Sequence, residues 1–222
     1  MDKEKKHPVE EFYRRKYPIG YHKKLPSGFI EWCHREEEFL LDTLEKDSSI
    51  LEIGCGEGRL LTVLADKSDD LKGIDLSLTA IKIAQDAHRY LANSQFYVMN
   101  ATNLKFVDSS FDYTLCMMNT FGNFYYNKQK ILTEMLRVTR PEDHVIISVH
   151  SEKALDDQIL LYHRLGYKSE KIDDDYVYCD SGLISERFSR EKLEEMLNAR
   201  NLKFKIESLC LDAYLCDIKV EK

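Results

Sequence analysis

The sequence predicts one α/β domain in which helices cover both faces of a doubly wound, mostly parallel sheet. Short apolar runs typical of buried strands alternate with stretches of helical periodicity, and a glycine-rich turn leads from the first run directly into a helix. The chain of 222 residues, 43% hydrophobic and 32% charged, is long enough for one well-buried core and too short for two. We therefore expect a single domain over 1–222.

Each element has a local signal. Ser77, Asn127 and Ser189 each precede a helical stretch and are predicted N-caps, and Pro141 is expected to end the helix that begins after Asn127. Helices are expected at about 30–45, 59–67, 78–91, 128–139, 152–165 and 190–201. Strands are expected at about 50–53, 71–75, 96–99, 110–116, 144–149, 176–179, 203–210 and 212–220, and the last two form a C-terminal antiparallel hairpin.

The turn after the first strand is suited to hold a nucleotide. Gly54, Gly56 and Gly58 permit a left-handed backbone or a very close approach, and the new helix presents unpaired N–H groups above the strand end. An acid, Glu52, stands two places before the first glycine. The dinucleotide fingerprint would need its third glycine at position 59, where this chain has Arg59. The spacing therefore disfavours a nicotinamide-dependent dehydrogenase.

Polar residues also follow the next three strands. Asp75 ends the second strand, where a carboxylate can accept two hydrogen bonds from a ribose diol. Asn100 follows the third strand with an amide that both donates and accepts. Asn119 follows the fourth strand and either faces the cleft or braces the turn. Asp112, at the start of that strand, is interpreted as a structural carboxylate that accepts backbone N–H groups.

In this order and spacing, the motifs of residues 48–150 resemble those of class I S-adenosylmethionine-dependent methyltransferases. The resemblance implies a Rossmann-like, seven-stranded sheet with one antiparallel strand, S-adenosyl-L-methionine as cofactor and S-adenosyl-L-homocysteine as product. It implies that Glu52 reaches the methionine part of the cofactor, largely through water, and that Asn100 lies against the adenine. The residues expected at the cofactor are Glu52, Gly54, Cys55, Gly56, Gly58, Asp75, Leu76, Asn100, Ala101, Thr102, Met117 and Asn119.

The resemblance also implies methyl transfer by in-line displacement. Because the sulfonium already makes its methyl a good electrophile, proximity and alignment carry most of the rate, and a base is needed only if the acceptor arrives protonated. The catalytic residues are therefore not assigned. His150, which follows the fifth strand, is a weak candidate for such a base, and a structural histidine is the favoured alternative.

Aromatic side chains indicate where an acceptor would bind. Residues 1–45 are expected to form an N-terminal helical cover over the cofactor-binding core of 48–150, and 151–222 to hold a substrate-side lid and the hairpin. The alternative is that the aromatic side chains anchor these segments to the core and do not contact an acceptor. The candidate pocket residues are Tyr13, Tyr17, Tyr21, Phe121, Asn123, Phe124 and Tyr178.

Absent motifs favour a small-molecule acceptor. The exit of the fourth strand lacks the double proline by which base-amino and glutamine methyltransferases hold a planar nitrogen. The carboxylate cluster of the catechol type is also missing, so no metal is implied. A methyltransferase of protein or RNA, and a cofactor-binding protein without transfer activity, remain alternatives.

Composition restricts the partners further. The net charge of −7 disfavours broad binding to nucleic acid, because that affinity comes mostly from Lys and Arg. Residues 1–24 nevertheless carry eight Lys or Arg against four Asp or Glu, as a solvated arm or as one that steers an anionic substrate. The six cysteines lack a Cys-x-x-Cys pair, so we expect reduced thiols and no zinc. Without an apolar membrane span or signal segment, the expected location is cytoplasmic.

Overall fold

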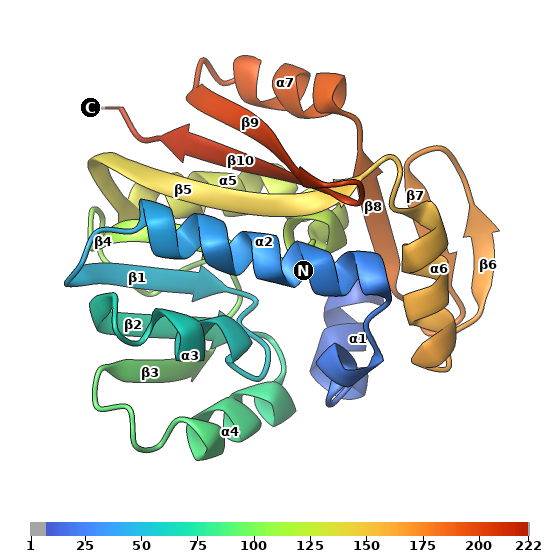
Figure 1. Cartoon of the computed structure of the whole chain (residues 1–222), viewed down its shortest axis with the longest axis horizontal. Coiled ribbons are helices and arrows are strands. Elements are labelled where there is room, and N and C mark those ends of the chain that lie inside the picture. Colours follow the sequence, from blue (N-terminus) through green and yellow to red (C-terminus); the bar gives the residue numbers. More distant parts are fainter. Residues whose placement is uncertain (1–7, 222) are drawn as a thin grey trace, which may run out of the picture.

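The computed structural model describes residues 8–221 and is built on a twisted sheet with helices on both faces (Figure 1). The central strands are β1 (Ser48–Ile53), β2 (Ser68–Asp75), β3 (Ser94–Val98), β4 (Phe111–Cys116), β5 (Thr139–Ser151), β9 (Lys203–Cys210) and β10 (Ala213–Lys219). They lie in the order β3-β2-β1-β4-β5-β10-β9, and among them β10 alone runs opposite to the rest. The predicted doubly wound, mostly parallel sheet and its terminal hairpin are confirmed, but the sheet has ten strands and not the seven expected, because three further strands extend it beside β5.

Each face of the sheet has its own apolar core. Helices α2 (Ser27–Thr43), α3 (Arg59–Leu64) and α4 (Leu78–Ala87) cover one face, where Leu40, Leu64 and Ile81 are buried together. Helices α5 (Lys128–Val138) and α7 (Arg190–Asn198) cover the other, where Leu132 and Leu193 are fully buried. Helix α2, which was expected to be part of the N-terminal cover, therefore also packs on a face of the sheet.

A small antiparallel extension was largely missed by the sequence patterns. Strands β6 (Ser169–Ile172), β7 (Tyr176–Cys179) and β8 (Ile184–Phe188) continue the sheet beyond the end of β5, and α6 (Leu155–Arg164) leads into them. Only β7 was predicted. The two missed strands have four and five residues and little apolar alternation, so their sequences carry almost no periodic signal.

The predicted helix ends are mostly right. The Oγ atoms of Ser77 and Ser189 each accept a hydrogen bond from a backbone N–H in the first helical turn, at 3.2 Å, so both N-caps are confirmed. Asn127 precedes α5 without capping it, because its backbone is already helical, with φ −84° and ψ −3°; its amide donates to Glu10. Pro141 lies inside β5 and not at a helix end, since α5 already stops at Val138.

Asp112 has the structural role that was predicted for it. Its carboxylate accepts hydrogen bonds from the backbone N–H and the Oγ of Ser49, both at 2.7 Å, and it pairs with Arg140. These bonds tie the start of β4 to the start of β1, far from the carboxyl ends of the strands.

The N-terminal segment packs beside α6 as an aromatic cover. It consists of α1 (Pro8–Lys16) and a short 3-10 helix, η1 (Tyr21–Lys24), followed by α2. Phe12 is buried against Tyr13 and Tyr167 at ring distances of 5.0 and 5.5 Å. Residues 1–7, with part of the basic arm, lie outside the described residues. Over residues 8–221, every helix is too short or too polar to cross a membrane.

Candidate functional site

One large cavity opens at the carboxyl ends of β1, β2, β4 and β5, and α1 covers it. Most of the predicted cofactor residues line it: Glu52, Gly54, Cys55, Gly56, Asp75, Leu76, Asn100, Ala101, Met117 and Asn119. The predicted pocket residues Tyr13, Tyr17, Tyr21, Asn123 and Phe124 line it as well, together with His150. The structure thus brings residues from opposite ends of the chain around a single cavity.

Two predicted cofactor residues lie behind the cavity wall. Gly58 is the N-cap of α3 with a φ of 81°, and a Cβ there would approach His88 Cε1 to 2.7 Å. Its glycine is required by a left-handed backbone and close packing, not by direct contact with the cavity. Thr102 donates its backbone N–H to Asn100 Oδ1 at 2.9 Å, so it shapes the turn that carries Asn100.

Two predicted pocket residues also lie elsewhere. Phe121 is fully buried in the core beside Phe124 and Phe188. Tyr178 lies on β7, where its ring packs against Tyr176 and the ammonium of Lys171. Neither ring lines the cavity, because the first points into the core and the second lies in the small sheet extension.

The glycine turn is anchored to the end of β2. Gly54 and Cys55 both donate their N–H groups to the carbonyl of Ile74, at 2.8 and 3.0 Å. Gly56 donates its N–H to Asp75 Oδ2 at 3.1 Å, and Ser77 donates its N–H to Oδ1 at 2.8 Å. The Asp75 carboxylate is thereby fixed in orientation, and each oxygen keeps a lone pair for a ligand.

Glu52 is a buried acid with an unsatisfied oxygen. It lies one residue before the end of β1 with 6% of its surface exposed, and its Oε2 has no hydrogen-bond partner among residues 8–221. Burial raises its pKa to about 8, against the opposing effect of the Arg59 guanidinium, while Glu36 and Asp75 raise it further. A buried carboxyl of this kind is poised to face a positive charge.

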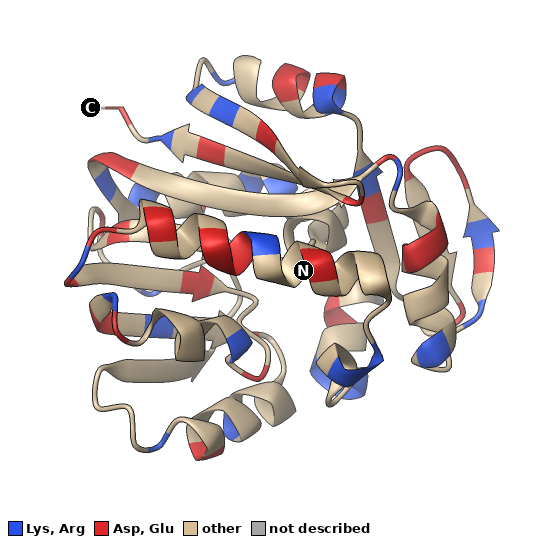
Figure 2. Cartoon of the chain, in the orientation of Figure 1, with Lys and Arg blue, Asp and Glu red and all other residues tan. Residues whose placement is uncertain are grey.

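The guanidinium of Arg59 already pairs with carboxylates of α2. It donates to Glu36 at 3.0 Å and also pairs with Glu37. In Figure 2 the red segments that mark Asp and Glu recur along α2. The site therefore contains a cation that is neutralised before any ligand arrives.

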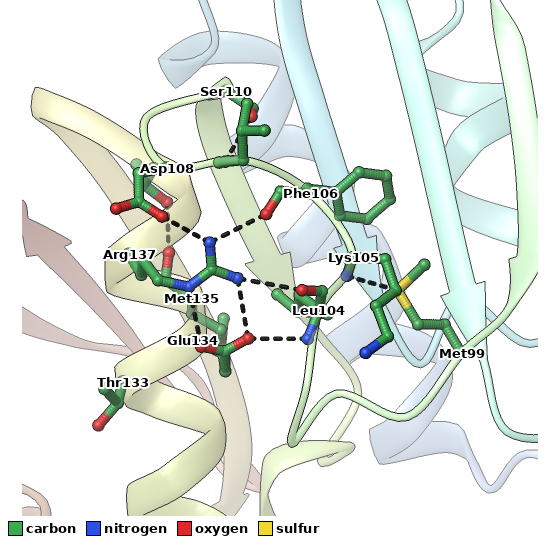
Figure 3. A network of polar contacts seen from close by, with 12 residues as sticks. Met99, Leu104, Lys105, Phe106, Asp108, Ser110, Thr133, Glu134, Met135 and Arg137 are labelled. Atoms are coloured by element: carbon green, nitrogen blue, oxygen red, sulfur yellow. Dashed lines mark hydrogen bonds and ion pairs between the residues drawn. The ribbon is translucent and has the colours of Figure 1, made fainter.

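The loop that carries Asn100 and Ala101 is held by a polar network on α5 (Figure 3). Arg137 donates to the carbonyls of Leu104 and Phe106 and pairs with Asp108 and Glu134. Glu134 in turn accepts the backbone N–H of Leu104 at 2.7 Å. Because these bonds restrain the loop after β3, its cavity-facing residues are positioned before a ligand binds.

The exit of β4 has a strained backbone. Met118 and Asn119 both have positive φ angles, 48° and 57°, which non-glycine residues rarely adopt. The Asn119 amide donates to Ser185 Oγ at 3.0 Å, and its oxygen accepts the backbone N–H of His150 at 3.0 Å. Asn119 thus lines the cavity and braces the turn at the same time.

The cover is fastened to the core by specific hydrogen bonds. Asn123 donates its amide to the hydroxyl of Tyr13 at 2.8 Å, and Gly20 donates its N–H to Glu57 at 2.6 Å. Tyr17 lies directly on the glycine turn, since a Cβ at Gly56 would be 2.6 Å from its hydroxyl. That hydroxyl is buried and has no partner among the described residues.

His150 is buried at the centre of the site. Its ring stacks on Phe29 at 4.8 Å and meets the edge of Trp32 at 5.0 Å. Burial, assisted by the charge of Arg187, lowers its pKa to about 3, so the imidazole is neutral at physiological pH. Within the described chain its Nδ1 has no hydrogen-bond partner.

Sequence reasoning missed the wall formed by α6 and the loops around it. Leu161, Tyr162, Tyr167 and Leu183 line the cavity, as does Phe29 of α2. The apolar positions of α6 gave a helical period but no indication of which core they face. Among residues 8–221 no cluster of three or more His, Cys, Asp or Glu could hold a metal ion.

The donor set around the glycine turn fits S-adenosylmethionine. Gly54 and Gly56 have left-handed φ angles of 73° and 55°, and the positions that a Cβ would take are already in close contact with Thr120 and Tyr17, so this turn tolerates no side chain. Asp75 offers two oriented oxygens to a ribose diol, and the unpartnered Glu52 offers a buried carboxyl that can ionise beside a positively charged group.

Comparisons with known proteins agree with this geometry. A family model described as a methyltransferase domain matches residues 44–203. Ajmaline N-methyltransferase of Rauvolfia serpentina is 31% identical over 141 residues, which cover 62% of this chain and 48% of that protein. Demethylmenaquinone methyltransferase of Bacillus licheniformis is 30% identical over 118 residues, 50% of this chain and 49% of that protein. The chain spans about half the length of these two curated relatives.

The fold has solved counterparts. The PH0226 protein of Pyrococcus horikoshii has a TM-score of 0.71 at 21% identity, over 95% of this chain and 99% of that one. At this identity the likeness concerns the fold alone.

Proposed function

This chain belongs to the methyltransferase domain family, and we propose that it transfers a methyl group from S-adenosylmethionine to a small-molecule acceptor. When bound, the cofactor supplies a methyl group made electrophilic by its sulfonium. Asp75 would hold the ribose hydroxyls, Glu52 would face the positively charged part of the cofactor, and Asn100 would lie against the adenine. The remaining task of the protein is to align the acceptor and to exclude water.

The closed cover is the observation that carries the proposal of a small acceptor. Helix α1 is fastened across the cavity mouth through Tyr13–Asn123 and Glu10–Asn127, and Tyr17 lies on the glycine turn. An acceptor beneath this cover must be small enough to be enclosed. A protein or RNA acceptor would need the cover to be displaced. Part of the basic N-terminal arm, residues 1–7, lies outside the described residues.

Labelled methyl transfer tests the proposal. The protein is incubated with methyl-labelled S-adenosylmethionine and a cell extract, which is then separated into metabolites and macromolecules. We expect label in the metabolite fraction with the wild type and its loss with Asp75→Ala. Label in protein or RNA would instead indicate a methyltransferase that acts on protein or RNA.

Calorimetric titration separates the remaining alternatives. Binding of S-adenosylmethionine and S-adenosylhomocysteine without any transfer would indicate a cofactor-binding protein. Binding of NAD alone would refute the interpretation of the glycine turn. The cytoplasmic location expected from the sequence stays a prediction, which fractionation of cells would test.

A further inference from the structure

The cavity has an aromatic part in addition to the proposed cofactor seat. Phe12, Phe29, Tyr162 and Tyr167 line it, with Leu161 and Leu183 beside them. These side chains belong to one cluster in which α1, α2, α6 and β7 meet. An acceptor in this part of the cavity is surrounded mainly by rings and aliphatic groups, which favour a planar apolar body.

Among the residues that the structure describes, no unpaired Lys or Arg lines the cavity to hold an anionic acceptor. Arg59 is the one Lys or Arg among the lining residues that the structure describes, and it pairs with Glu36 and Glu37. Arg187, close behind His150, donates to Gln158 and to two backbone carbonyls. A carboxylate or phosphate would therefore be buried without a counter-charge, which is strongly unfavourable.

Four cavity-lining side chains of the described residues have a buried polar atom without a partner, and two of them, Tyr17 and Glu52, lie at the glycine turn, which leaves His150 and Asn123 for an acceptor. The Nδ1 of His150 and the Oδ1 of Asn123 are buried, and neither has a hydrogen bond within residues 8–221. His150 lines the cavity, and the stack on Phe29 fixes the plane of its imidazole. A hydroxyl satisfies either tautomer of His150, because it can donate to an unprotonated Nδ1 or accept from a protonated one.

We propose that the acceptor is an uncharged, planar, hydroxyl-bearing small molecule whose ring lies among these aromatic side chains and whose hydroxyl hydrogen-bonds to His150. This inference rests on the proposed function and names its substrate class. His150 is in this view the polar anchor of the acceptor, and its neutral imidazole adds no charge beside a cationic cofactor.

Three para-substituted toluenes test the inference: p-cresol and p-xylene, which are nearly isosteric, and 4-methylbenzoate, which carries a larger, negatively charged group. Each is titrated into protein saturated with S-adenosylhomocysteine, and binding is followed by NMR, including the imidazole ¹⁵N signals of His150. We expect p-cresol to bind about tenfold more tightly than p-xylene, as for one hydrogen bond. We expect no binding of 4-methylbenzoate.

Matched variants identify the anchor. His150→Phe keeps a ring to stack on Phe29 and removes the nitrogen, so the variant should bind p-cresol and p-xylene with about equal affinity. His163→Phe changes an exposed histidine of α6 and should leave the preference unchanged. If His150→Phe does not fold, the ¹⁵N shift of His150 Nδ1 in the wild type on addition of p-cresol supplies the same test.

The outcomes distinguish this inference from the proposed function. Failure of S-adenosylhomocysteine to bind would overturn the proposed function itself. Normal binding of S-adenosylhomocysteine together with equal binding of p-cresol and p-xylene, or with preferred binding of 4-methylbenzoate, would overturn only the substrate class.

Discussion

Replacement of Glu52 by glutamine should remove a proton-linked part of cofactor binding. Glu52 is buried, its Oε2 is unpartnered, and its pKa of about 8 leaves it mostly protonated at neutral pH in the free protein. A positively charged ligand favours the carboxylate, so binding must release this proton. Affinity in the wild type should therefore rise as the pH increases from 6 to 8 and level off above 8.

The magnitude follows from the two pKa values. If the bound ligand returns Glu52 to its ordinary pKa of 4.5 from about 8, the interval is roughly 3.5, and at about 1.4 kcal/mol per pKa unit the coupling is on the order of 5 kcal/mol. This is an upper limit, because the ligand recovers only part of the interval. The slope cannot exceed a tenfold gain in affinity per pH unit.

Calorimetry in two buffers of different ionisation enthalpy measures the protons released on binding of S-adenosylmethionine. The ligand's own amino group titrates in both proteins, so the difference between wild type and Glu52→Gln reports the carboxyl. We expect the wild type to release up to one proton more at pH 7. Equal proton release by the two proteins would refute this account of Glu52.

Glu52→Gln should remove part of the free energy of cofactor binding, but it should increase the stability of the ligand-free protein. Because the folded-state pKa of Glu52 lies above its unfolded value, its favourable contribution is complete below about pH 4.5 and is lost as the pH rises to 8. Ligand-free Glu52→Gln should therefore gain thermal stability relative to the wild type between pH 5 and 8.5. A difference independent of pH would contradict the raised pKa.

Three further variants, with Gly166→Ala as a control, test the glycine turn and its surroundings. Asp75→Ala should weaken S-adenosylmethionine binding by about 1.5 to 3 kcal/mol in calorimetry, as for a hydrogen bond to a charged group, and unchanged affinity would exclude the ribose assignment. Ser77→Ala should cost about 1 kcal/mol in chemical denaturation, because the N-cap of α4 is lost. Gly56→Ala adds contact with Tyr17 to left-handed strain, so it should weaken cofactor binding, whereas Gly166→Ala, strained but with open space around it, should lower only stability.

The part of the site that follows from strand order was predictable from the sequence. Glu52 and Asp75 lie at the carboxyl ends of β1 and β2, Asn100 follows β3, and the carboxyl ends of parallel strands meet at one edge of the sheet. The spacing of the glycines then restricts which class of nucleotide ligand can bind above these residues. Here local pattern and topology together place residues that are far apart in the chain.

The part that depends on packing was not predictable. Aromatic composition marked both Tyr17 and Tyr178 as pocket residues, yet only Tyr17 lines the cavity. Asn127 has the sequence context of an N-cap, but its amide is taken by Glu10, 117 positions earlier in the chain. Such choices are made by tertiary neighbours, and a local pattern does not contain them.

Arg59 shows how one departure from a familiar motif acquires meaning only in the fold. In the sequence it marked the absence of a third glycine and so disfavoured a dinucleotide. In the structure it begins α3 and is paired with two carboxylates of α2. Its charge is therefore not available to satisfy Glu52, which keeps a buried, unpartnered oxygen beside the glycine turn. The charge arrangement thus favours a positively charged ligand over an anionic one, in agreement with the sulfonium cofactor and with an uncharged acceptor.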